Sequence, residues 1–77
     1  MINAYLGVDI GSISTKGVII DDHNKILASS YIWTKGNPME AVKTLIHNLE
    51  NQIDKTKIHI IGVGTTGSAR KLIGTML

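Results

Sequence analysis

One amphipathic helix pattern sets the order of elements in this chain. Asn37 is a good N-cap, Pro38 fits the first helical position, and Glu40 is placed to close a capping box. Apolar residues then recur at helical spacing and define one face, formed by Val42, Leu45, Ile46, Leu49 and Ile53. We therefore expect a helix here, with three strands before it and a strand and a second helix after it.

The segments on either side of this helix have the apolar, β-branched character of strands. The polar turn at 22–24 has the chemistry of a hairpin. The expected strands are Tyr5–Ile10, Lys16–Asp21, Lys25–Trp33 and Ile58–Val63, and a last helix follows from Ser68. The order β-β-β-α-β-α predicts an α/β fold with a mixed sheet.

Two loops far apart in the sequence are expected to meet in this fold. The hairpins make the first three strands antiparallel neighbours, and a right-handed helix crossover delivers the fourth strand parallel to the first. If those two strands are adjacent, the loops at 11–14 and 64–67 emerge at one edge of the sheet. Open α/β sheets bind ligands at the carboxyl ends of strands, so the topology predicts one cleft.

Size and composition limit the chain to one small domain. It has 77 residues, no cysteine and a net charge of +2, which excludes disulfides and gives no argument for nucleic acid binding. No apolar run reaches the roughly 18 residues of a membrane span, and we expect a cytoplasmic protein without membrane contact. Because the chain ends on apolar Met76 and Leu77, residues 1–77 are expected to be one partial domain of a longer protein.

The first loop has the residue types that bind phosphate. Glycine lets backbone N–H groups approach an anion, hydroxyls add hydrogen bonds and lysine adds a positive charge. The candidates are Gly11, Ser12, Ser14, Thr15 and Lys16. Asp9, at the end of the strand, can hold Mg²⁺ through water. The alternative is an ordinary hairpin with a surface lysine and a turn-capping aspartate.

The second loop formally matches a dinucleotide fingerprint, G-x-G-x-x-G, at 62–67. The match is weak, because that fingerprint normally follows the first strand of its unit. A polar lining for the same cleft is favoured, from Gly64, Thr65, Thr66 and Gly67. A nicotinamide-binding module and a plain strand-to-helix turn remain alternatives.

Both loops resemble motifs of known ATPases. The stretch Tyr5–Asp21 resembles the first phosphate motif of the actin/hexokinase/Hsp70 superfamily, whose ribonuclease-H-like core has the order β-β-β-α-β. Carbohydrate kinases of that superfamily open in nearly the same way. The stretch Ile61–Arg70 is similar to the Gly-x-Gly-x-Thr-Gly-x-x-Arg segment of the BadF/BadG/BcrA/BcrD ATPase family.

This resemblance implies an activator in which ATP hydrolysis drives electron transfer from a [4Fe-4S] cluster. The partner enzyme would be a 2-hydroxyacyl-CoA dehydratase or a benzoyl-CoA reductase. Asp9 would be the catalytic, Mg²⁺-associated aspartate, and the two loops would bind ATP or ADP. The chain lacks the cluster cysteines and later nucleotide motifs, so alone it should hold no cluster and hydrolyse ATP poorly. The alternatives are a carbohydrate kinase fragment and a ligand-free structural piece, and edge strands could pair two copies into a homodimer.

Overall fold

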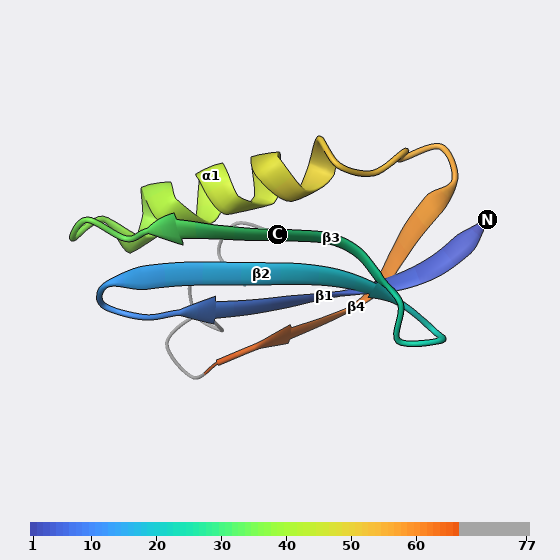
Figure 1. Cartoon of the computed structure of the whole chain (residues 1–77), viewed down its shortest axis with the longest axis horizontal. Helices are drawn as coiled ribbons and strands as arrows, with labels where there is room; N and C mark the ends of the chain where they lie inside the picture. The colour runs from blue at the N-terminus through green and yellow to red at the C-terminus, as the bar shows by residue number, and fades with distance from the viewer. Residues whose placement is uncertain (67–77) are drawn as a thin grey trace.

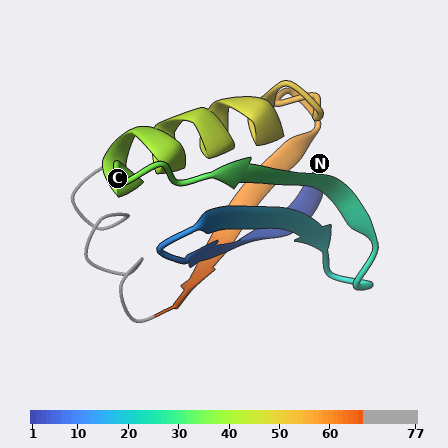
Figure 2. The same cartoon turned by 60° about the vertical axis from the view of Figure 1, so that its left-hand side comes forward.

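The computed structural model describes residues 1–66, which form a four-stranded mixed sheet with one helix against one face (Figures 1 and 2). The elements are β1 (Ile2–Ile10), β2 (Ser14–Asp21), β3 (Ile26–Trp33), α1 (Pro38–Glu50) and β4 (Ile58–Thr65). The order β-β-β-α-β confirms the α/β prediction for this part of the chain. The last predicted helix lies outside the described residues.

The strand order is β3-β2-β1-β4. β1 pairs antiparallel with β2, and β2 with β3, whereas β4 runs parallel to β1. The arrowheads of β1 and β4 therefore point toward the same end of the sheet (Figure 1). The expected neighbouring of the first and fourth strands is confirmed.

Four strand boundaries differ from those expected: β3 begins one residue later, at Ile26, and the other three strands are longer than predicted. β1 begins at Ile2, β2 begins at Ser14, and β4 continues to Thr65. In each case the neighbouring strand continues the hydrogen-bonded ladder: Ser14 pairs with Trp33 of β3, and Thr65 pairs with Val8 of β1. Pairing thus outweighs the local turn preference of serine, threonine and glycine at these ends.

Helix α1 begins where the sequence predicts. The side chain of Asn37 accepts a hydrogen bond from the Glu40 N–H at 3.2 Å, which is an N-cap. The second half of the predicted capping box is absent among the described contacts, because the Asn37 N–H donates to the Thr34 carbonyl instead, at 3.0 Å. The start of the helix is thereby tied to the end of β3.

The core lies between α1 and the facing side of the sheet. Its buried apolar residues are Ala4, Leu6, Val8, Ile19, Ala28, Val42, Leu45 and Leu49. Gly17 of β2 lies directly beneath the helix, where an added Cβ would come within 2.8 Å of Leu45 and 3.0 Å of Leu49. Close approach of the helix to the middle of the sheet therefore depends on this glycine.

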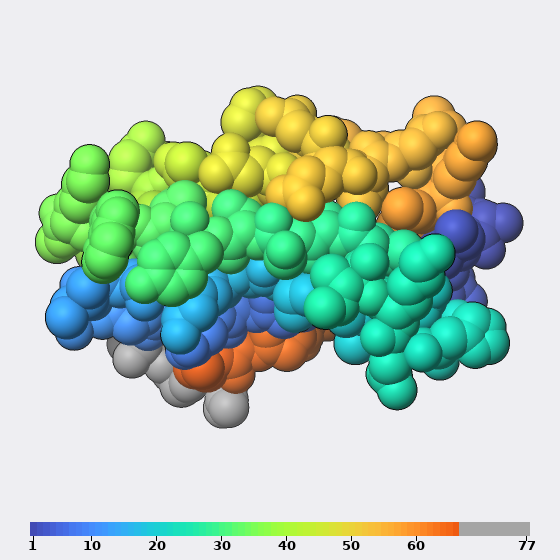
Figure 3. All heavy atoms as spheres, in the orientation of Figure 1, coloured from blue at the N-terminus to red at the C-terminus, as the bar shows by residue number. Residues whose placement is uncertain are grey.

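The opposite face of the sheet is not covered by any element that the structure describes. Tyr31 and Trp33 of β3 lie there, more than half exposed, with their rings 5.8 Å apart in an edge-to-face arrangement. In the space-filling view, β3 and α1 form two adjacent bands along the molecule (Figure 3).

No helix among residues 1–66 has the length and apolar character that a bilayer crossing requires.

Candidate functional site

The turn between β1 and β2, residues 11–13, carries the candidate anion site. Its base is closed by the Gly11 N–H, which donates to the Ser14 carbonyl at 2.8 Å. No described residue accepts a hydrogen bond from the N–H of Ser12 or Ile13. Both residues are exposed, and no described residue competes with a ligand for these two successive backbone donors.

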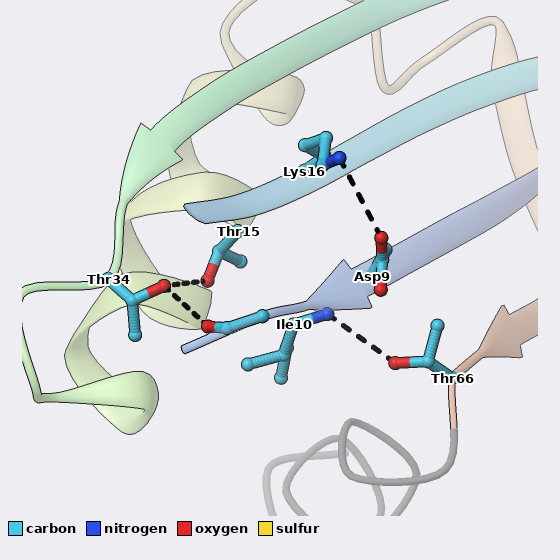
Figure 4. Close-up of polar contacts among 7 residues, drawn as sticks. Asp9, Ile10, Thr15, Lys16, Thr34 and Thr66 are labelled. Carbon is cyan, nitrogen blue, oxygen red and sulfur yellow. Dashed lines mark hydrogen bonds and ion pairs between the residues drawn. The ribbon is translucent and has the colours of Figure 1, made fainter. Parts of the chain in front are cut away.

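Thr34, which the sequence does not identify as a site residue, holds this turn from behind (Figure 4). The Thr34 hydroxyl donates to the Gly11 carbonyl at 2.8 Å, and the Thr34 N–H donates to the Ile13 carbonyl at 2.8 Å. Thr34 is only 4% exposed. No sequence signal identifies it, because its partners lie more than 20 positions earlier in the chain.

Thr15 does not face the open turn as expected for a phosphate ligand. Its side chain is fully buried, and its hydroxyl lies 2.9 Å from the Thr34 hydroxyl (Figure 4). Alternation along β2 explains this placement, since Thr15, Gly17 and Ile19 all point toward α1. The Thr15 side chain therefore supports the turn instead of lining the ligand surface.

Asp9 and Lys16 lie opposite each other on the uncovered face of the sheet. They are register partners on β1 and β2, and the Lys16 ammonium is 3.9 Å from the Asp9 carboxylate. Both side chains are about half exposed, at 54% for Asp9 and 53% for Lys16, so water screens their attraction. The Lys16 ammonium also lies 6.0 Å from the centre of the Tyr31 ring. The pair can separate at little cost and is accessible to a ligand.

The end of β4 lies beside the end of β1, as the topology predicts. The Thr66 N–H donates to the Val8 carbonyl at 3.2 Å. The Thr66 hydroxyl accepts from the Ile10 N–H at the long distance of 3.5 Å, as Figure 4 shows. Gly64 and Thr65 belong to β4 and not to a loop, because the ladder with β1 extends to Thr65. Gly67 lies outside the described residues.

These segments border one open hollow of about 460 Å³ on the uncovered face. It is lined by Gly7, Val8, Asp9, Lys16, Gly17, Val18, Gly64, Thr65 and Thr66. The structure thus brings Asp9 and Lys16 together with Gly64–Thr66. Ser12 lies in the adjoining turn, whereas the Thr15 side chain lies on the opposite face of the sheet, which packs against α1.

The first two glycines of the formal dinucleotide pattern lie within a strand and not in a turn. Gly62 and Gly64 both lie within β4, and the Tyr5 ring covers Gly62, where an added Cβ would meet the ring at 3.0 Å. A dinucleotide turn needs its first glycines between a strand and a helix, close to the pyrophosphate. This arrangement does not favour nicotinamide binding at Gly62.

The donor set fits a hydrated Mg²⁺ and does not fit an iron–sulfur cluster. Asp9 offers one accessible carboxylate, which suits a cation that keeps most of its water and takes other ligands from phosphate. Residues 1–66 contain no group of three or more potential metal-binding side chains. The sequence has no cysteine for a cluster.

Comparisons with known proteins identify no relative whose site could be compared with this one. No protein-family model matches the chain, and neither the curated proteins nor the solved structures contain a significant match.

Proposed function

We propose that this chain binds the phosphate groups of Mg-ATP or Mg-ADP at the turn between β1 and β2. The observation that carries the proposal is the pair of backbone donors at Ser12 and Ile13, which no described residue uses, beside the accessible Asp9–Lys16 pair. Phosphate is commonly bound by backbone N–H groups together with a mobile cation, and a nearby carboxylate can hold hydrated Mg²⁺.

The sheet topology supports a nucleotide site at this edge. β1 and β4 are parallel neighbours, and their carboxyl ends meet where Thr66 bonds to Val8 and Ile10. Ligands of open α/β sheets bind at this kind of edge. In this proposal the turn holds phosphate oxygens, Lys16 turns from Asp9 toward the phosphate, and Asp9 orients the water shell of the metal.

We infer further that the fold is the start of a ribonuclease-H-like, actin-type ATPase core, and that the parent protein is an ATPase of the BadF/BadG/BcrA/BcrD type. The β-β-β-α-β order and the two sequence motifs support this inference. The parent would couple ATP hydrolysis to electron transfer into a 2-hydroxyacyl-CoA dehydratase or benzoyl-CoA reductase. Its cluster ligands would have to lie outside this chain.

An amide NMR titration of the 77-residue chain tests the binding proposal. Mg-ADP is expected to shift the amides of Ser12 and Ile13 most strongly, with smaller shifts at Gly64–Thr66. NAD⁺ at the same concentration serves as the parallel ligand. Lys16→Met should weaken Mg-ADP binding about threefold to tenfold, because it removes one charge-assisted contact.

The matched control is Lys43→Met, on the exposed side of α1 and away from the turn. It should bind Mg-ADP like the unmodified chain. Shifts centred on β4 with NAD⁺ alone would contradict the proposal and favour a dinucleotide site. Equal effects of the two lysine substitutions would show that the shifts report general charge screening.

A further inference from the structure

We infer that Thr34 is a positioning residue that holds the turn 11–13 in the shape needed to bind phosphate; this inference rests on the proposed function. Thr34 follows β3 directly and makes three contacts toward the back of the turn. Its side chain is nearly inaccessible, so it does not touch the ligand itself.

The geometry shows how one residue sets the direction of the ligand-binding amides. The Thr34 hydroxyl fixes the Gly11 carbonyl, and the Thr34 N–H fixes the Ile13 carbonyl, each at 2.8 Å. The Gly11 carbonyl shares its trans peptide unit with the Ser12 N–H, so this N–H points away from Thr34, and the Ile13 carbonyl belongs to the unit that follows the Ile13 N–H. With both carbonyls turned toward Thr34, the N–H groups of Ser12 and Ile13 have no acceptor within the described residues.

Thr15 completes the arrangement. Its hydroxyl lies 2.9 Å from the Thr34 hydroxyl, and the Thr34 hydroxyl already donates its proton to Gly11. A hydroxyl has one proton and two acceptor sites, so Thr15 must be the donor to Thr34. The chain of bonds runs from Thr15 through Thr34 to Gly11, and it orients the Thr34 hydroxyl uniquely.

The two ends of the turn also lie close together. An added Cβ at Gly11 would lie 3.0 Å from the Ser14 carbonyl, so the two ends of the turn are in close contact. A small rotation of the Gly11 peptide unit would therefore move the following amides. We expect anion affinity to depend on the Thr34 hydroxyl although no ligand contacts it.

The test compares Thr34→Val, which keeps the shape and removes the hydroxyl, with Thr34→Ser, which keeps the hydroxyl. Thr44→Val on the exposed side of α1 is the matched control. For each 77-residue variant, Mg-ADP affinity is measured by NMR titration, and amide exchange is measured at Gly11 and at core residue Leu6. Thr34→Val should lose about threefold to tenfold in affinity, as expected for one hydrogen bond, while Thr34→Ser and Thr44→Val retain it.

Amide hydrogen exchange tests the role of Thr34 independently of the proposed nucleotide binding. Thr34→Val should speed exchange at Gly11 more than at Leu6, because the turn opens before the core does. Equal acceleration at both positions, or none at Gly11, would overturn the positioning role whether or not ligand binds. If the unmodified chain shows no shifts with Mg-ADP, the proposed function fails, and the Gly11 exchange still decides whether Thr34 holds the turn.

Discussion

Asp21 ends β2 and closes the turn into β3 with its own side chain. One carboxylate oxygen accepts from the His23 N–H at 2.8 Å and from the Lys25 N–H at 2.9 Å. The hydrogen bond from the Lys25 amide is the main reason that the pKa of Asp21 lies below its ordinary value; burial opposes this shift, and the His23 amide reinforces it. The amide hydrogen bonds that shape this turn thus favour the ionised form of the Asp21 carboxylate.

The stability of the chain should fall as Asp21 is protonated. Because the pKa of Asp21 is lower in the folded than in the unfolded state, its stabilisation is present above the unfolded value and is lost as the pH falls through the folded value. The free energy of unfolding should therefore decline below about pH 4. Asp21→Asn keeps an oxygen acceptor but cannot ionise, so urea unfolding should show a smaller decline over this range.

Asp22→Asn is the control for this substitution, since Asp22 is the adjacent exposed carboxylate, lies 3.6 Å from the His23 ring and has no backbone N–H bonded to it among residues 1–66. Its unfolding free energy should follow the pH dependence of the unmodified chain. An Asp21→Asn variant with an unchanged pH dependence would show that the two amide hydrogen bonds do not favour the ionised carboxylate.

At the scale of elements, the sequence predicts which helices and strands form, and in what order, better than it predicts the residues at which they begin and end. The helix pattern locates α1 because Asn37 and Pro38 act locally and the apolar face repeats over several turns. The site is predicted less completely. Asp9 and Lys16 are candidates because of their residue types beside a glycine turn, whereas the burial of Thr15 and the contacts of Thr34 depend on how β2, β3 and the turn pack. Such non-local pairing leaves no trace in local sequence.

The outer edge of β3 carries a side-chain contact that the sequence does not predict. The Gln52 side chain donates to the Ser29 carbonyl at 2.8 Å and accepts from the Ser29 N–H at 3.2 Å. Its amide therefore occupies the place of a neighbouring strand at this residue. Exposed strand edges invite pairing with another chain, so Gln52 limits the edge available for self-association.

Gln52→Ala should uncover this edge. We expect amide exchange at Ser29 to rise about fivefold, as for the loss of one hydrogen bond, and sedimentation to show more self-association at high concentration. Asn51→Ala, which changes the neighbouring exposed residue, is the control and should leave both measurements unaltered. Unchanged Ser29 exchange would mean that the side-chain amide does not protect the strand. The homodimer expected from the sequence stays a prediction, and the same sedimentation data test it.

At the scale of the whole molecule, the two faces of the sheet have different roles. One face packs against α1 and supplies the core, whereas the other carries Asp9, Lys16 and the hollow beside Gly64 and has no cover among residues 1–66. Neighbouring residues of β2 lie on opposite faces. Val18 lines the hollow, and Ile19 is a core residue that is 4% exposed.

Two lysine substitutions one position apart therefore test this architecture. Ile19→Lys buries a charge against α1 and should lower the free energy of unfolding by at least about 3 kcal/mol, a large share of the roughly 5–15 kcal/mol of a small domain. Val18→Lys places the charge on the accessible face and should change it by less than about 1 kcal/mol. Urea unfolding followed by circular dichroism measures both. If Val18→Lys lowered the free energy of unfolding as much as Ile19→Lys, the Asp9–Lys16 face would have to be covered by protein. Asp9 and Lys16 would then be inaccessible, and only the turn 11–13 could bind phosphate.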